Sequence, residues 1–386
     1  MSTPLAGLAQ RSWDAVVIGA GPAGAVTATL LARRGLAVLL VDKAAFPRPK
    51  VCGGCLNRAA LAALEAAGLA GVPRRLGAPP LTRLRLYSGR RSAIVRLREG
   101  AGVSRPALDT ALVAAAQEAG VTFVDGTVAH AGLPAAGGRP VRLSRGHQQG
   151  QVHARVVVAA SGLGPLPADD AEALPALPAP TARIGAGAIA AAAPPQVEPG
   201  EIVMVHGPGG YVGLVRVEED QLNVGAAFDP PSVKTAGGIG PAAALLDRAG
   251  LPLAPLLRSL RWRGTPPLTF RRRGLAREHL LVLGDAAGYV EPFTGEGMAW
   301  ALAGALALAP LATAAAQGWD PQLGRRWEQA YQQVVGRRQR LCRLVAATLR
   351  RPILTSAVIT VLGAAPPLAG PAVAAINAPP RWHTVP

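Results

Sequence analysis

A glycine-rich turn near the start of the chain has the residue types and spacing to hold a dinucleotide. It consists of Gly19, Ala20, Gly21, Pro22, Ala23 and Gly24, between an apolar strand and an Ala/Leu-rich helix. Glycines permit the tight turn and let backbone N–H groups approach a pyrophosphate, and the positive end of the helix attracts phosphate. A second apolar strand, 37–41, ends on Asp42, which is placed to accept hydrogen bonds from a ribose diol and disfavours a 2′-phosphate. Such turns also occur without ligands, so the ordered series of strand, turn, helix, strand and acid carries the prediction.

A second segment, 284–298, could place polar groups against an extended ring system. Asp285 follows a buried strand and could hold sugar or polyol hydroxyls, while Pro292 and Gly295 shape a loop. A long Ala/Leu helix begins near Gly297, and its N-terminus would stabilise negative charge on a ring in front of it. Taken alone, the segment could equally be a plain connection between strand and helix.

Taken together, these segments resemble the FAD-dependent oxidoreductases of the aromatic-hydroxylase superfamily, in the branch that contains geranylgeranyl reductases. Three motifs carry the resemblance over about residues 13–350: the glycine-rich turn with Asp42-Lys43, the run Lys50-Val51-Cys52-Gly53-Gly54, and the segment 284–298. The first motif is shared by many flavoproteins, whereas the other two are more specific to this branch.

The resemblance implies noncovalently bound FAD, since no covalent linkage motif is evident. It places Arg105 near the FAD phosphates and ribityl chain, the backbone of Val128 at the adenine, and Ser161-Gly162 under the cofactor. The predicted cofactor-binding residues are Gly19, Ala20, Gly21, Pro22, Ala23, Gly24, Asp42, Lys43, Lys50, Gly53, Gly54, Arg105, Val128, Gly284, Asp285, Pro292, Gly295, Glu296, Gly297 and Met298.

Cys52 is the candidate catalytic residue, because the resemblance places it beside the isoalloxazine ring. A thiol there could tune the flavin potential, add to the ring reversibly or donate a proton. Cys52 and Cys55 also form a C-x-x-C pair, so a redox-active dithiol is an alternative. That alternative expects a second GxGxxG motif for a nicotinamide cofactor, and none follows a later strand. Inert packing is the third interpretation. Zinc is disfavoured because no second ligand pair lies at a suitable spacing.

The favoured function is redox chemistry on a hydrophobic small molecule, namely C=C reduction or dehydrogenation by hydride exchange at flavin N5. Geranylgeranyl reductases carry Tyr-x-Trp-x-Phe-Pro where this chain has residues 209–215, and only Tyr211 matches. The catalytic lysine of the related halogenases has no match. One alternative is a monooxygenase that hydroxylates a phenolic or polyketide-type substrate, and another is a non-catalytic FAD-stabilised adapter. The external electron donor, NAD(P)H or ferredoxin, stays open.

These residues must be positioned by strands and helices, and the order of the expected elements predicts an α/β fold. It has a Rossmann-like FAD-binding domain, an antiparallel β-sheet substrate domain and a C-terminal helical region. We expect a helix over 57–67, a hairpin over 81–97, an irregular stretch over 165–180 and antiparallel strands from 201 to 228. The predicted division assigns 13–75, 103–165 and 275–315 to the FAD-binding domain, 76–102 and 166–274 to the substrate domain, and 316–386 to the helical region.

Composition narrows the partners. Half of the 386 residues are hydrophobic and 16% are charged, which indicates a globular chain. The net charge of +17 has two interpretations: a basic face that meets an anionic membrane or an acidic carrier protein, or a general compositional bias toward arginine. Only 4% of residues are aromatic and no nucleic-acid module is apparent, so a nucleic-acid partner is not expected.

Cysteine content and apolar runs predict where the protein acts. Three cysteines cannot form a disulfide framework, and no signal peptide is recognisable, so we expect a cytoplasmic protein. The apolar stretch 352–377 is broken by prolines and is too short for a spanning helix. It is expected to be a helical hairpin that packs on the protein, with contact at a bilayer surface as the alternative.

Overall fold

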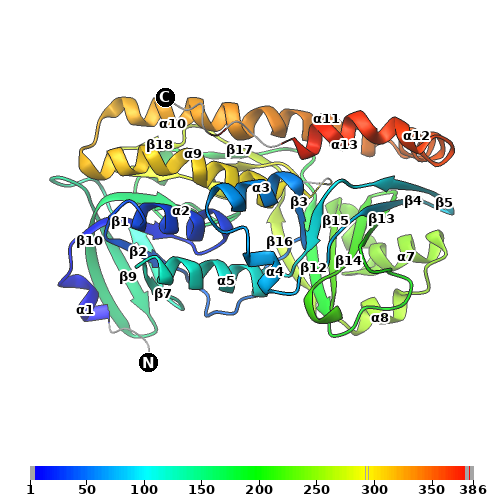
Figure 1. The fold of residues 1–386 in the computed structure, drawn as a ribbon, viewed down its shortest axis with the longest axis horizontal. Coiled ribbons are helices and arrows are strands. Elements are labelled where there is room, and N and C mark those ends of the chain that lie inside the picture. Colours follow the sequence, from blue (N-terminus) through cyan, green and yellow to red (C-terminus); the bar gives the residue numbers. More distant parts are fainter. Residues whose placement is uncertain (1–4, 292, 294, 379–381, 383–386) are drawn as a thin grey trace.

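The computed structural model describes residues 5–291, 293, 295–378 and 382. The described residues form two large β-sheets, which lie side by side (Figure 1), and two small ones of two and three strands. A row of helices runs along the top of both large sheets in the view of Figure 1. We call the sheet with order β18-β19-β10-β1-β2-β7, to which β9 and β8 are joined through β10, the first sheet. The sheet with order β16-β12-β15-β14-β13-β4-β5 is the second sheet. The row of helices consists of α9 (Gly297–Gln317), α10 (Pro321–Tyr331), α11 (Arg337–Leu349), α12 (Pro352–Ala364) and α13 (Gly370–Asn377).

The first sheet brings four strand ends to one edge. β1 (Trp13–Ile18) pairs in parallel with β2 (Val38–Val41) and with β10 (Gln148–Ala159), and β10 pairs in parallel with β19 (Leu280–Val282). Near these ends the strands are apolar and buried, over residues 15–18 of β1, 38–41 of β2, 156–159 of β10 and 280–282 of β19, as in a sheet that is covered on both faces. Since the strands run in one direction, the turns that follow them meet at a single edge, which is where open α/β sheets bind ligands.

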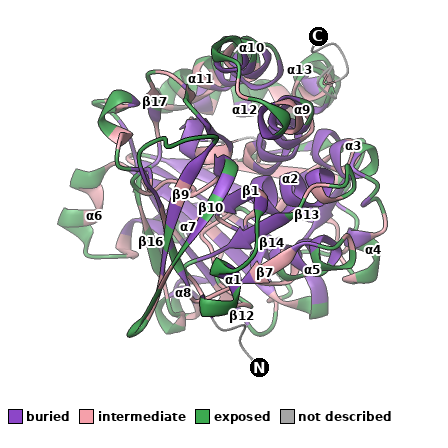
Figure 2. Cartoon of the chain, turned by 90° about the vertical axis from the view of Figure 1, so that its left-hand side faces the viewer, coloured by how far each residue is buried: buried purple, intermediate pink, exposed green. Residues whose placement is uncertain are grey.

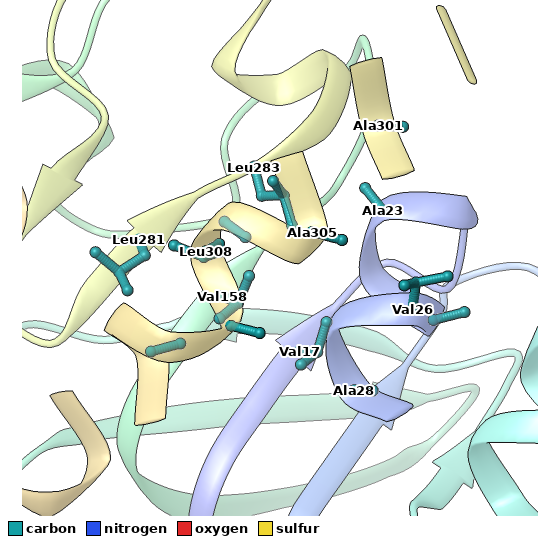
Figure 3. Packing of buried hydrophobic residues seen from close by; sticks show 14 of the residues in the cluster. Val17, Ala23, Val26, Ala28, Val158, Leu281, Leu283, Ala301, Ala305 and Leu308 are labelled. Atoms are coloured by element: carbon teal, nitrogen blue, oxygen red, sulfur yellow. The ribbon is translucent and has the colours of Figure 1, made fainter. Parts of the chain in front are cut away.

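Two apolar helices cover one face of this sheet at close range. α2 (Pro22–Ala32) packs against α9, and Figure 3 shows Ala301 and Ala305 of α9 close to Ala23 of α2. Small side chains on both helices allow this approach. By length and hydropathy α9 could cross a membrane, but 78% of its apolar window is buried inside the protein. We therefore assign α9 to the core.

The second sheet forms the other half of the molecule. β12 (Ile184–Ala190), β15 (Leu222–Phe228), β14 (Gly210–Arg216) and β13 (Glu201–Gly207) pair antiparallel, and β13 pairs in parallel with β4 (Arg83–Ser88). Helix α7 (Gly240–Ala249) contacts β13 and β14. Figure 2 shows the strands of both sheets mainly buried, with exposed segments such as α6 (Pro230–Ala236) on the outside.

The remaining elements are α5 (Arg105–Glu118), which has 14 residues, and a set of shorter helices and strands. The shorter helices are α1 (Leu5–Ala9), α3 (Arg58–Ala66), α4 (Val72–Arg75) and α8 (Ala254–Ser259). The strands are β3 (Cys55–Asn57), β5 (Arg91–Arg96), β6 (Gly100–Gly102), β7 (Thr122–Val124), β8 (Val128–Ala131), β9 (Arg139–Arg145), β11 (Ala176–Pro178), β16 (Arg263–Pro267), β17 (Phe270–Arg272), β18 (Ala276–Arg277) and β20 (Gly288–Tyr289). Single turns occur as η1 (Ala171–Ala173), η2 (Glu218–Asp220), η3 (Gly284–Ala287), η4 (Gln332–Gly336) and η5 (Pro366–Ala369).

Most of the elements expected from the sequence are confirmed. The α/β fold class is correct, the predicted helix over 57–67 is α3, and the predicted hairpin is β4–β5. The stretch 165–180 is largely irregular, as predicted, except for the short turn η1 and the three-residue strand β11, which pairs with β17. That pairing joins segments far apart in sequence, and a Pro/Ala-rich composition gives no sign of it. The predicted domain boundaries stay a prediction.

Candidate functional site

A cavity of about 610 Å³ begins at the meeting point of the strand ends and extends to the second sheet. This volume is typical of a small-molecule site. The predicted site residues that line it are Gly19, Gly21, Pro22, Ala23, Asp42, Lys43, Lys50, Cys52, Gly53, Arg105, Val128, Gly284, Asp285, Gly295, Gly297 and Met298. Residues separated by almost 280 positions (Gly19 to Met298) thus share one cavity.

Four further predicted site residues do not line the cavity. The backbone N–H of Ala20 donates to Asp42 at 2.8 Å, and Gly54 packs on Asn223. Gly24 lies inside the turn, and the Glu296 carboxylate is buried 3.8 Å from Arg338. Pro292 lies outside the described residues.

The glycine-rich turn is closed by two glycines that touch. Gly19 has φ +106°, a conformation that favours glycine. A Cβ on Gly24 would lie 1.9 Å from the carbonyl oxygen of Gly19, so only hydrogen fits there. Gly21 caps α2 and Pro22 occupies its first turn, which leaves the helix N-terminus facing the cavity. The local sequence therefore builds a cradle for an anionic group.

Two arginines stand over this cradle. A Cβ on Gly21 would lie 3.4 Å from a terminal nitrogen of both Arg48 and Arg105. Arg105 is held by a bidentate pair with Asp109, with both distances 2.8 Å, and Arg48 reaches the same carboxylate at 3.2 Å. Burial acts to lower the pKa of Arg105, but Asp109 outweighs it and the pKa is raised. Both guanidinium groups are thus fixed and charged where a pyrophosphate would lie.

Asp42 is oriented by its own backbone neighbours. One carboxylate oxygen accepts from Ala20 N at 2.8 Å and the other from Ala44 N at 2.9 Å, while Arg48 Nε lies 3.3 Å away. The side chain is 7% exposed and lines the cavity. Carboxylate oxygens have several lone pairs, so Asp42 keeps acceptor capacity toward a ribose diol.

Lys50 and Asp285 face each other in the same cavity. Burial lowers the pKa of Lys50, against the influence of the Asp285 carboxylate. Burial also raises the pKa of Asp285, and Lys50 works in the opposite direction. Each group depends on the other to stay charged in these surroundings.

Unsatisfied polar atoms test whether these residues fit FAD. Ser161 Oγ is buried without a hydrogen-bond partner among the described residues and lines the cavity, whereas Asn57 Nδ2, which also has none, belongs to the far part of the cavity. Buried polar groups of this kind usually bond a ligand or water. The backbone of the cradle and the two arginines can donate to a pyrophosphate, Asp42 can accept from a ribose, and Ser161 Oγ can bond a further polar group. The residues present therefore fit the dinucleotide cofactor.

Cys52 is positioned by the second sheet. Asn223 Nδ2 on β15 donates to the Cys52 carbonyl at 2.9 Å, and Asn223 is 4% exposed. Gly225 on the same strand has no side chain, and a Cβ there would lie 3.1 Å from that carbonyl oxygen. Gly187 on β12 likewise makes room for Val51. The segment Val51–Gly54 therefore lies directly on the sheet, with Cys52 lining the cavity.

Cys55 does not have the properties of an attacking thiol. Its Sγ donates to Gly53 O at 3.2 Å, and burial raises the pKa of the thiol. Disulfide chemistry needs the thiolate, which this environment disfavours. Cys52, Cys55 and Cys342 are all free thiols. These observations favour a single reactive thiol at Cys52 over the dithiol alternative.

The far part of the cavity is apolar. Leu84, Ile202, Met204 and Leu268 line it from the second sheet and its flank, and the rings of Tyr211 and Phe293 meet edge to face at 5.0 Å between centroids. Burial raises the pKa of Tyr211 well above its usual value, so its hydroxyl stays neutral. Helix α13 adds Val373, Ile376 and Asn377 to the lining.

Sequence reasoning missed several residues of the site. The cavity lining includes Arg48 and Tyr289, and Asp109 pairs with Arg48. Outside the lining, Asn223 bonds the Cys52 carbonyl, and Glu291 is a further residue that was missed. Glu291 is 3% exposed and pairs with Arg183 at 3.0 Å. A signal existed only for Arg48, which stands two positions before Lys50.

Known proteins resemble this chain at the level of a family model, a local sequence match and whole-chain folds. Residues 12–199 match the family model of the FAD binding domain. A menaquinone reductase of Mycolicibacterium smegmatis is 51% identical over 57 residues, which are 15% of this chain and 14% of that relative. The alignment thus spans about a seventh of the relative's length.

Two solved structures share the fold over nearly the whole chain. A flavin-dependent brominase has a TM-score of 0.78 at 16% identity and covers 95% of this chain and 94% of its own. A geranylgeranyl bacteriochlorophyll reductase-like protein from Thermoplasma acidophilum has a TM-score of 0.74 at 20% identity, with 92% of both chains covered. At these identities the likeness concerns the fold alone.

Proposed function

We propose that this chain, an FAD-dependent oxidoreductase with the FAD-binding domain of the aromatic-hydroxylase family, reduces a carbon–carbon double bond in a long apolar molecule of the isoprenoid type. The predicted cofactor and enzyme class are confirmed by the family match over residues 12–199. The substrate and the direction of the reaction are the proposal.

The continuity of the cavity carries this proposal. It starts at the glycine-rich turn, passes Cys52 and ends among Leu84, Met204 and Leu268. Among the described residues, the far part is lined mainly by apolar side chains. The polar groups there are those of Asn57, Glu99 and Thr265 and the tyrosine hydroxyls. An apolar chain gains about 0.8 kcal/mol for each CH₂ that it buries in such surroundings. The cavity therefore favours a hydrocarbon chain over a polar ring.

Bound FAD, once reduced by an external donor of the NAD(P)H or ferredoxin type, would supply a hydride from its N5 atom. Reduction of a C=C bond also needs a proton at the second carbon, and we assign this proton to the thiol of Cys52. Asn223 holds the Cys52 backbone, and the Tyr211–Phe293 pair adds an aromatic surface to the cavity wall. After transfer, the thiolate regains its proton from solvent, which completes the balance of atoms and charge.

The relatives support this substrate class. The local match to a menaquinone reductase is 51% identical, and menaquinone carries an apolar prenyl chain of the kind that fits the cavity. The shared fold of a geranylgeranyl bacteriochlorophyll reductase-like protein agrees with the same class.

Product mass tests the proposal. The holoprotein is reduced by dithionite without oxygen, mixed with menaquinone in detergent, and the product is analysed by mass spectrometry. Because dithionite alone also reduces the quinone ring, the product is reoxidised in air before analysis, and a gain of two hydrogen atoms that then remains supports the proposal. Failure to turn over any prenylated substrate overturns it, and a gain of one oxygen atom in air would identify the monooxygenase alternative.

Cys52→Ser provides the matched variant for the role of the thiol. We expect it to keep full flavin absorbance and to reduce substrate severalfold more slowly, because serine is a far weaker acid than a thiol. Unchanged turnover would remove the catalytic role of Cys52. The same assay with NADPH, NADH or reduced ferredoxin in place of dithionite identifies the electron donor.

A further inference from the structure

Exposed apolar side chains are concentrated on the C-terminal helices. Of the eleven large apolar residues that are exposed in the described part of the chain, seven lie between residues 341 and 368. Ile353 is 84% exposed and Val361 is 52% exposed. We call these seven residues the C-terminal apolar surface: Leu341, Leu344, Ile353, Leu354, Val358, Val361 and Leu368. Contiguous exposed apolar groups of this kind mark an interaction site.

Helix α12 is the centre of this surface. It contains no charged residue, and within it only Thr355 and Ile359 are buried. One side of α12 contacts β5 and β4 of the second sheet, as Figure 1 also shows at the right of the molecule. The other side has no partner among the described residues.

Arginines surround the C-terminal apolar surface. On α11, Arg337 and Arg340 precede Leu341 and Leu344 by four residues, so each arginine shares a helix face with an exposed leucine. On the other side, Arg91 of β5 donates to Ser356 of α12 at 2.8 Å. The chain has no Asp or Glu after Glu328. The exposed arginines of these two flanks are Arg90, Arg91, Arg96, Arg98, Arg337, Arg340 and Arg351.

We propose that this surface docks on an anionic lipid bilayer, which delivers the substrate to the cavity. Binding at a membrane interface grows with the apolar area that is buried and with the attraction to anionic lipid, and an exposed apolar helix beside cationic side chains supplies both. Charge complementarity selects anionic lipid, since each arginine near such a surface contributes about 1 kcal/mol. Thirteen residues of α12 extend about 20 Å, which is shorter than the hydrocarbon core, so the helix lies on the bilayer and does not span it.

The same helices lead into the cavity. η5 joins α12 to α13, and α13 lines the apolar end through Val373 and Ile376. The cavity reaches the protein surface there, because Glu99 lines it and is exposed. Asn377 closes the gap to α3 by accepting from Arg58 N at 3.3 Å. The opening at Glu99 is the route by which a lipid-like molecule would pass from the bilayer to the cavity, whereas the Asn377 contact closes the side toward α3. This route rests on the proposed function, whereas the docking itself does not.

Vesicle flotation tests the docking. The holoprotein is mixed with vesicles of phosphatidylcholine alone or with phosphatidylglycerol added. We expect it to float with the anionic vesicles and to bind the neutral ones at least tenfold more weakly. Ile353→Asp and Val358→Asp should each reduce binding to anionic vesicles about tenfold or more, and Arg340→Gln about fivefold.

Leu133→Asp is the matched control. Leu133 is 58% exposed and follows β8 in the first sheet, so its change should leave vesicle binding as it is. Flavin absorbance and circular dichroism establish that each variant is folded. If the holoprotein does not bind anionic vesicles, the docking proposal is overturned. It is also overturned if ultracentrifugation shows a dimer that Ile353→Asp abolishes while vesicle binding is unchanged, because the surface is then a contact between two copies of the chain. If docking holds but no prenylated substrate is reduced, the proposed function fails and the docking proposal stands.

Discussion

Asn223→Ala should separate the position of Cys52 from the binding of FAD. The Asn223 side chain is 4% exposed, lies outside the cavity lining, and donates to the Cys52 carbonyl at 2.9 Å. Removing the donor leaves a buried carbonyl without this partner, which costs about 2 kcal/mol. Since the contact joins the Val51–Gly54 segment to β15, we expect the loss to fall mainly on that segment.

The magnitude can be read from the reactivity of the thiol. If modification of Cys52 requires the segment to leave the sheet, 2 kcal/mol raises the open population, and with it the alkylation rate, by up to about thirtyfold. The assay measures iodoacetamide labelling of Cys52 by peptide mass spectrometry, together with flavin absorbance and turnover. We expect faster labelling, full flavin and severalfold slower turnover.

Trp262→Phe is the matched control, because it removes an indole N–H that donates to the Leu257 carbonyl at 2.8 Å away from the cavity. It should lower stability without changing the labelling of Cys52. The reasoning is refuted if Asn223→Ala labels and turns over at the rates of the unaltered protein while its melting temperature falls as far as in the control.

Three further predictions concern the cofactor cradle and stability. Gly24→Ala puts a Cβ 1.9 Å from a backbone oxygen, so it should lower the free energy of unfolding by about 3 kcal/mol or more and abolish flavin retention. Gly7→Ala is the control, because a Cβ there has nothing within 4 Å and should change neither property. Urea unfolding measures the stability and flavin absorbance measures the retention. Asp285→Ala removes a carboxylate from the cavity lining and should weaken cofactor retention, so a variant purified at full flavin occupancy would contradict it. Burial acts to raise the pKa of Asp170, but Arg139 outweighs it, and the pKa is lowered from its ordinary value of 3.8. The ion pair therefore stabilises the protein fully above pH 3.8, and this stabilisation is lost as the pH falls through the pKa of Asp170 in the folded protein. Asp170→Asn should therefore melt earlier at pH 7 and approach the unaltered protein in acid; a constant difference in melting temperature would show the prediction to be wrong.

Local sequence was sufficient for the turn and its helix. Gly19, Gly24 and Pro22 restrict the backbone within a few residues, and Asp42 ends the next strand, so their arrangement follows from neighbours in the chain. The caps of α3 and α5 by Asn57 and Ser104 are local in the same way. The C-terminal segment was predicted as a helical hairpin packed on the protein, and it does form helices with one side on the second sheet.

The sequence by itself thus determined the FAD cradle, the α/β class and the candidacy of Cys52, because short-range backbone rules and a resemblance in motifs are properties of neighbouring residues. Only the tertiary structure decided that Asn223 supports Cys52 from 171 positions away and that Arg48 joins Asp109 over the cradle. It also decided which side of α12 is left uncovered. Such pairs depend on how whole sheets and helices pack, and packing energy is shared among many residues that no local pattern records.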